Sequence, residues 1–87
     1  MNDIRDTLEE RGTRYGAFCD HAEICQELKD VMRDTPNWES LRPDQKEALE
    51  MIQHKIARIL NGDPDYVDSW TDIAGYSTLV ADRLGVE

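Results

Sequence analysis

Carboxylate side chains at helical spacing are the residues of this sequence best suited to chemistry. Glu47 and Glu50 are three residues apart and Asp68 and Asp72 are four apart, so each pair lies on one side of a helix. Mg²⁺ takes about six oxygen ligands and combines carboxylates with water and phosphate oxygens. The spacing therefore predicts an Mg²⁺ site from the two pairs, with Asp65 and Asp68 as another choice for the second pair.

Two cations follow the first carboxylate pair along the chain. Lys55 and Arg58 are candidates to contact the phosphate oxygens of a metal-bound ligand. An ordinary solvated face is the alternative, because Glu50, His54 and Arg58 are spaced by four and form helix-stabilising pairs worth about 0.2–0.5 kcal/mol each. Asp68 also has a structural alternative, as an acid in the first turn of a helix.

Three short motifs carry a family resemblance. Residues 11–16 read R-G-T-R-Y-G, residues 55–58 read K-I-A-R and residues 68–76 read D-S-W-T-D-I-A-G-Y. This pattern resembles a small family of phage and prophage helical proteins, which is distantly similar to the MazG-type all-α nucleotide pyrophosphohydrolases. The resemblance implies carboxylates on two helices that hold Mg²⁺, which bridges a nucleoside triphosphate and helps to generate the attacking water. The chain has Asp where that wider family commonly has Glu, so either an active or a degenerate site is compatible with it.

These observations lead to a first functional hypothesis. We expect a nucleotide-handling protein with a MazG-like helical core that binds or hydrolyses a nucleoside triphosphate with Mg²⁺. The expected metal ligands are Asp68, Asp72, Glu47 and Glu50, and the expected phosphate ligands are Lys55 and Arg58. Its enzyme class would be a Mg²⁺-dependent pyrophosphohydrolase.

The charge distribution supports a second hypothesis. The formal net charge of −9 argues against direct binding to a nucleic-acid backbone. Between Asp63 and Glu87 the chain has six acids and Arg83 as the only base. The alternative function is therefore a non-enzymatic acidic protein that binds a host protein, with DNA-like charge as the mechanism.

Other residues with chemical potential have structural explanations. Cys19, His21 and Cys25 lack the second ligand pair that zinc sites usually have, and His54 is the only other histidine. His21 falls on an apolar helix face and is expected to be a hydrogen-bonded core residue. Both cysteines are expected to be free thiols of a reducing cytoplasm. No secretory signal or membrane span is evident, so we expect a cytoplasmic protein, in the host cell if phage-encoded.

Proline and glycine positions divide the chain into the elements that must place these residues. We predict helices over residues 3–10, 15–33, 43–61 and 66–84, with Gly12 ending the first. The expectation is a single all-α domain over residues 1–87, a bundle of about four helices.

Three of the predicted helices have an apolar stripe to bury. The stripe of the third helix is Leu49, Ile52, Ile56, Ile59 and Leu60, and that of the fourth is Tyr66, Trp70, Ile73, Ser77, Val80 and Leu84. Gly75 and Leu79 fall on the acidic side of the fourth helix, with Tyr76 at the edge of its stripe. These three residues are candidates for an interface, and so short a chain would gain stability from self-association.

Overall fold

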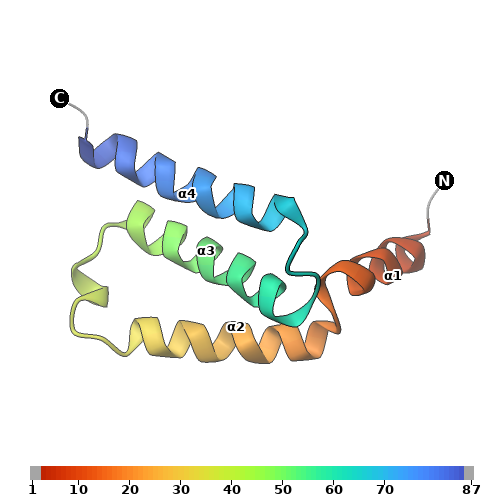
Figure 1. Cartoon of the computed structure of the whole chain (residues 1–87). Coiled ribbons are helices and arrows are strands. Elements are labelled where there is room, and N and C mark those ends of the chain that lie inside the picture. Colours follow the sequence, from red (N-terminus) through yellow and green to blue (C-terminus); the bar gives the residue numbers. More distant parts are fainter. Residues whose placement is uncertain (1–2, 86–87) are drawn as a thin grey trace.

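Helices account for nearly all regular structure in the chain. The computed structural model describes residues 3–85, and this part has four α-helices, one short 3-10 helix and no strand. In chain order the elements are α1 (Ile4–Tyr15), α2 (Phe18–Arg33), η1 (Trp38–Ser40), α3 (Pro43–Asn61) and α4 (Val67–Gly85) (Figure 1). The all-α prediction is confirmed.

The bounds of α3 match the prediction because the residues at its ends have strong positional preferences. Pro43 occupies the first turn, where its missing N–H is not needed. The backbone N–H of Arg42 donates to Oε1 of Gln45 at 2.8 Å, which caps this end. At the other end Gly62 follows Asn61, and its N–H donates to the carbonyl of Arg58 at 3.0 Å.

The prediction that Gly12 ends the first helix is wrong. α1 continues through Gly12 to Tyr15 and ends at Gly16, whose φ is 79°. A glycine inside a helix costs only about 1 kcal/mol relative to alanine, whereas a positive φ strongly favours glycine. The second helix accordingly begins at Phe18 and not at Tyr15.

Helices α2, α3 and α4 lie side by side and antiparallel, with α3 in the middle, while α1 extends from one end (Figure 1). α3 packs against both of its neighbours. Its buried residues are Ala48, Gln53, Lys55 and Ala57. Small residues on the flanks of α3 therefore allow close helix contact, and the two faces of the layer stay open.

This arrangement corrects the predicted core. Leu49, Ile56 and Leu60, assigned to a buried stripe, are 40 %, 37 % and 66 % exposed. Trp70 is 54 % exposed, and its indole N–H donates to the carbonyl of Pro64 at 2.8 Å. The stripes are apolar, as predicted. Much of their surface nevertheless faces out of the layer, because each helix contacts its neighbours through the side of the helix next to the stripe. Trp38 of η1 is buried.

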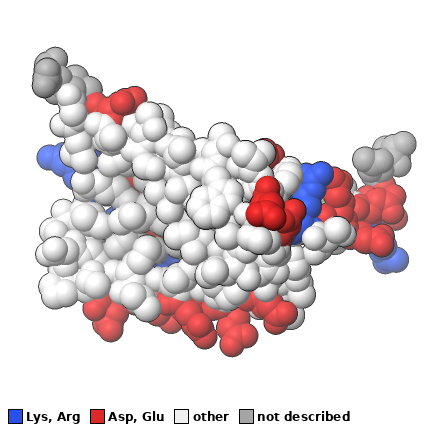
Figure 2. All heavy atoms as spheres, in the orientation of Figure 1, with Lys and Arg blue, Asp and Glu red and all other residues white. Residues whose placement is uncertain are grey.

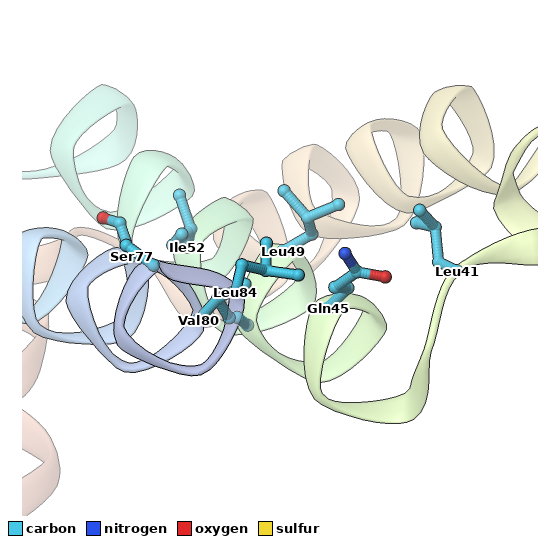
Figure 3. Close-up of a pocket in the computed structure, with 9 residues that line it drawn as sticks. Leu41, Gln45, Leu49, Ile52, Ser77, Val80 and Leu84 are labelled. Atoms are coloured by element: carbon cyan, nitrogen blue, oxygen red, sulfur yellow. The ribbon is translucent and has the colours of Figure 1, made fainter. Parts of the chain in front are cut away.

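The outward-facing apolar residues form a groove between α3 and α4. It has a volume of about 350 Å³ and is lined by residues that include Leu49, Ile52, Val80 and Leu84 (Figure 3). Figure 2 shows a broad face of the molecule with almost no charge, bordered by a row of acids along α2. In residues 3–85 no large side chain is fully buried.

No helix in the described range 3–85 combines the length and the apolar character that crossing a membrane requires.

Candidate functional site

The end of α1 is attached to the turn between α3 and α4. The side-chain amide of Asn61 donates to the carbonyls of Tyr15 and Ala17, at 2.9 and 3.0 Å. The N–H of Asp63 donates to the carbonyl of Arg14 at 2.6 Å. A Cβ at Gly16 would collide with the carbonyl oxygen of Asn61, so a glycine is required at this crossing. The R-G-x-x-Y-G motif is thereby placed against α3.

Two arginine–tyrosine contacts form at this crossing. The guanidinium carbon of Arg58 lies 4.1 Å from the ring centre of Tyr15. That of Arg14 lies 4.6 Å from the ring centre of Tyr66, and its Nη1 donates to the Tyr66 hydroxyl at 2.5 Å. The hydroxyl donates in turn to Oδ2 of Asp68 at 2.9 Å, which raises the pKa of Tyr66. The three sequence motifs therefore meet in one place.

Two cavities with shared walls lie beside these contacts. The first, of about 330 Å³, is lined by Thr7, Glu10, Arg11, Arg14, Tyr15 and Arg58. The second, of about 220 Å³, shares Arg11, Tyr15 and Arg58 with the first and extends to other residues of α1, α2 and α3. We call Arg11, Arg14 and Arg58 the arginine cluster. Among residues 3–85, Glu10 is the only acid that lines either cavity, and it pairs with Arg14 at 3.0 Å. The site is thus locally cationic in an acidic chain.

Lys55, the other candidate for phosphate binding, is used elsewhere. It is 7 % exposed, and its Nζ lies 3.2 Å from Oδ2 of Asp72 on α4. This pair joins the flanks of α3 and α4, and Lys55 does not line either cavity. Of the two predicted phosphate ligands, only Arg58 lies in the arginine cluster.

The four predicted metal ligands have separate partners. Glu50 pairs with Arg33 of α2, whereas Asp68 and Asp72 bind Tyr66 and Lys55 as described. Glu47 lines a groove of about 300 Å³ between α3 and α4. Within residues 3–85 no three carboxylates bring their oxygen atoms together. One copy of the chain therefore does not gather these acids into one site.

The predicted interface residues remain at the surface. Tyr76 and Leu79 line the same groove as Glu47, and Leu79 is 68 % exposed. Outside the chain neighbours and the backbone of α4 itself, no atom of residues 3–85 lies within 4 Å of the position that a Cβ would take at Gly75. This side of α4 is therefore not covered by another helix of the described part of the chain.

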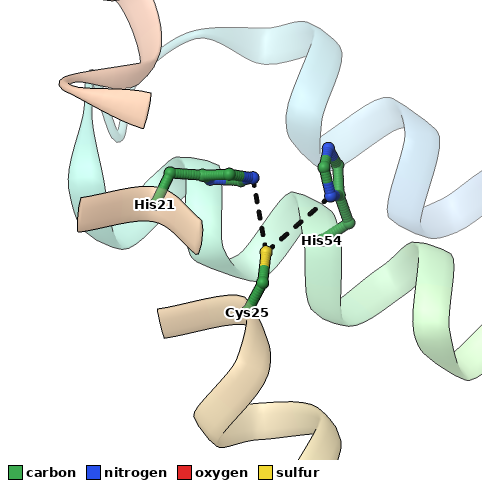
Figure 4. Close-up of side chains that lie close together, drawn as sticks. All are labelled: His21, Cys25 and His54. Atoms are coloured by element: carbon green, nitrogen blue, oxygen red, sulfur yellow. Dashed lines mark hydrogen bonds between the residues drawn. The ribbon is translucent and has the colours of Figure 1, made fainter. Parts of the chain in front are cut away.

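The structure also assembles a cluster that the sequence prediction did not identify. His21 and Cys25 of α2 lie against His54 of α3, with the Cys25 Sγ 3.3 Å from His21 Nε2 and 3.8 Å from His54 Nδ1 (Figure 4). His21 and Cys25 are one turn apart, which was a usable signal. Cys19 is exposed and His54 comes from another helix, so only the packing of α2 on α3 completes the cluster.

Burial controls the protonation of this cluster. It lowers the pKa of His54 from 6.5 to about 4, with the positive charge of Arg58 acting in the same direction. Burial and Arg58 also lower the pKa of His21. Burial raises the pKa of the Cys25 thiol, against a smaller opposite effect of Lys29. Both imidazoles are therefore neutral near neutral pH.

Comparison with known proteins identifies a family. A family model described as "Domain of unknown function (DUF6378)" matches residues 2–84. No curated protein and no solved structure matches the chain. Because the matched range is nearly the whole chain, the protein belongs to the DUF6378 family.

Proposed function

We propose that this protein binds a nucleoside triphosphate as its Mg²⁺ complex, with the phosphates at the arginine cluster. The observation that carries this proposal is the convergence of Arg11, Arg14 and Arg58 on two adjoining cavities in a chain with a net charge of −9. Guanidinium groups bind phosphate oxygens through paired, charge-assisted hydrogen bonds. A local surplus of positive charge in an acidic protein favours a small polyanion over a long nucleic-acid backbone, which the remaining acids would repel.

The size and shape of the site support a nucleotide-sized ligand. The cavities measure about 330 and 220 Å³ and share one wall, and small-molecule sites commonly measure about 300–1,000 Å³. Arg58 is already oriented by its contact with Tyr15, and Arg14 by its bond to Tyr66. Less side-chain entropy is therefore lost when a phosphate binds.

Mg²⁺ would enter the site already bound to the phosphates of the nucleotide. Bound Mg²⁺ usually keeps water and phosphate ligands and needs only one or two carboxylates. Of the four predicted metal ligands, Asp68 is the one linked to the arginine cluster, through Tyr66, and we propose it as the first protein ligand of the metal. Asp72, Glu47 and Glu50 take part only if a second copy of the chain brings them close to Asp68. We propose that one copy of the chain is sufficient for binding, whereas hydrolysis requires an assembly of two copies.

Self-association is part of this proposal. The apolar groove and the exposed Leu49, Ile56 and Leu60 leave one face of the layer without a cover. Two copies that each carry −9 repel one another, and the repulsion is smallest when the surfaces in contact lack charge. The nearly uncharged face in Figure 2 satisfies that condition, so we propose that a second copy covers it.

Thermal shift and calorimetric titration with nucleotides and Mg²⁺ test the binding proposal. Canonical and modified triphosphates should raise the melting temperature of the wild type, and Arg11→Ala together with Arg58→Ala should remove the shift. Arg5→Ala is the matched control, because Arg5 is an exposed arginine of α1 outside the cluster. Equal shifts in both variants, or no shift with any nucleotide, would contradict the proposal.

A specific surface feature supports the second candidate function, binding to a basic host protein. Four exposed acids follow one edge of α2 at helical spacing: Asp20, Glu23, Glu27 and Asp30. Figure 2 shows acidic side chains as a row along this helix. Replacement of all four by their amides should abolish salt-sensitive co-purification with a basic partner. Unchanged co-purification would argue against a charge mechanism.

A further inference from the structure

Three side chains typical of transition-metal sites meet between α2 and α3. His21 and Cys25 come from successive turns of α2, and His54 comes from the facing side of α3 (Figure 4). We propose that they bind a borderline-soft divalent ion such as Zn²⁺, through one thiolate and two imidazole nitrogens. This site is separate from the carboxylates considered for Mg²⁺, and it does not depend on nucleotide binding.

The distances between the ligand atoms fit a tetrahedral ion. With a zinc–sulfur bond of about 2.3 Å and zinc–nitrogen bonds of about 2.0–2.1 Å, a tetrahedral angle places sulfur and nitrogen about 3.5 Å apart. The Sγ of Cys25 lies 3.3 Å from Nε2 of His21 and 3.8 Å from Nδ1 of His54. All three ligand atoms lie within 4.8 Å of one another. Small side-chain rotations suffice to bring them to one ion.

Hydrogen bonding leaves one polar atom of this cluster without a partner. The thiol of Cys25 can donate its proton to one imidazole and accept from the N–H of the other. The other ring nitrogen of His21, Nδ1, is buried without a partner. An ion would use the lone pairs of the thiolate, of Nε2 of His21 and of Nδ1 of His54 at once.

The protonation state of the two imidazoles suits binding. Burial and the nearby Arg58 keep both imidazoles neutral, which is the form that binds metal. Binding replaces the thiol proton of Cys25, which passes to solvent, and the sulfur–metal bond forms in its place. No oxidation or reduction is involved, and affinity should therefore rise with pH.

The charges around the cluster define the fourth ligand. Lys29, Lys55 and Arg58 all lie close enough to oppose protonation of His54. An ion of charge +2 with one thiolate keeps a net +1, so these cations favour an anionic fourth ligand. His21 and His54 also line the cavity that contains Arg11 and Arg58. The open position thus faces a cationic cavity, as in sites where zinc keeps one exchangeable ligand.

Cobalt titration of the intact chain tests the site without any nucleotide. Co²⁺ bound by a thiolate and two imidazoles should give strong visible absorption and a sulfur-to-cobalt charge-transfer band, saturating at one ion per chain. Zn²⁺ should displace it and raise the melting temperature. Cys25→Ser should lose the charge-transfer band and His54→Gln should weaken binding, whereas Cys19→Ser, which removes the exposed thiol, should behave as wild type.

A second measurement covers the case in which a variant fails to fold. In the wild-type chain, Zn²⁺ should slow alkylation of Cys25 and leave that of Cys19 unchanged. The proposal is overturned if the wild type gives no charge-transfer band. It is also overturned if Cys19→Ser removes the band, or if Zn²⁺ protects both thiols equally or neither.

Discussion

The guanidinium of Arg58 lies over the ring of Tyr15, 4.1 Å from its centre. This contact joins two motifs that are more than forty positions apart in the sequence, the end of α1 and the last turns of α3. It also holds Arg58 at the wall shared by the two cavities. One cation–π pair therefore contributes both to the attachment of α1 and to the arrangement of the arginine cluster.

Replacement of Tyr15 measures how much its aromatic ring contributes to stability. Tyr15→Leu should lower the free energy of unfolding by about 0.5–2 kcal/mol more than Tyr15→Phe, because phenylalanine keeps an aromatic face for Arg58. Urea unfolding followed by circular dichroism measures the difference. Equal losses in the two variants would mean that the ring contributes only by apolar packing.

Two glycines of the same motif should respond in opposite directions. Gly16→Ala should destabilise the protein by about 1–3 kcal/mol, since Gly16 has a positive φ and its Cβ would meet Asn61. Gly12→Ala should stabilise it by about 0.4–1 kcal/mol, because Gly12 lies inside α1 with open space around it. Thermal and urea unfolding give both values. A stabilising Gly16→Ala would contradict the crossing described for α1 and α3.

The uncovered apolar face should control self-association. Leu49→Glu places a charge at the groove between α3 and α4 and should convert dimers into monomers in sedimentation or light-scattering measurements. Leu79→Glu introduces the same charge on the opposite side of α4 and should leave dimers intact. If Leu79→Glu alone dissociates the protein, the contact surface is the one expected from the sequence at Gly75, Tyr76 and Leu79.

Stability should fall with acidification before most carboxylates are protonated. The folded-state pKa of His54 is about 4, below its ordinary value of 6.5, so between these values the unfolded chain binds more protons. The contribution of His54 to the free energy of unfolding is therefore fully present above about pH 6.5 and declines as the pH falls toward about 4. The groups that face His54 and oppose its protonation are Arg58, His21, Lys55 and Lys29.

Melting temperatures from about pH 7 to about pH 5 measure this dependence. His54→Gln should give a flatter profile, with the remaining slope due to His21, whose pKa is lowered in the same direction. An identical slope in wild type and variant would show that His54 is not held neutral by its surroundings.

The buried charge of Lys55 should make its partner important for stability. Asp72→Asn leaves the ammonium group buried without a counter-charge and should cost about 1–3 kcal/mol. Adding Lys55→Met should recover much of the loss, since both charges are then removed. Chemical unfolding of the two single variants and the double variant gives the coupling. Additive losses would indicate that the ion pair has no structural role.

Local sequence signals predicted the helices well but not which faces they bury. Pro43 and Gly62 define α3 because their backbone preferences act locally. Gly12 and Gly16 look alike in the sequence, and only the contact of Gly16 with Asn61 distinguishes them. The exposure of Trp70 and Leu60 follows from helices that lie in one layer, an arrangement that no single-helix pattern encodes.

Individual residues of the candidate site could be predicted from the sequence, but their convergence in space could not. Arg58 was a candidate phosphate ligand, and the R-G-x-x-Y-G motif was recognised without a role for its arginines. Their convergence depends on the attachment of α1 to the α3–α4 turn through Asn61. His54 was assigned to a solvated face, because its partners on α2 are about thirty residues away in sequence.

The central position of α3 links the two faces of the molecule. Its exposed Leu49 and Ile56 lie on one side of the helix, whereas His54 and Arg58 lie on the opposite side. A rotation of α3 about its own axis would move both sets together. If two copies pair through the side that carries Leu49, a ligand that shifts α3 changes the dimerisation constant by the same factor by which dimerisation changes the affinity for that ligand.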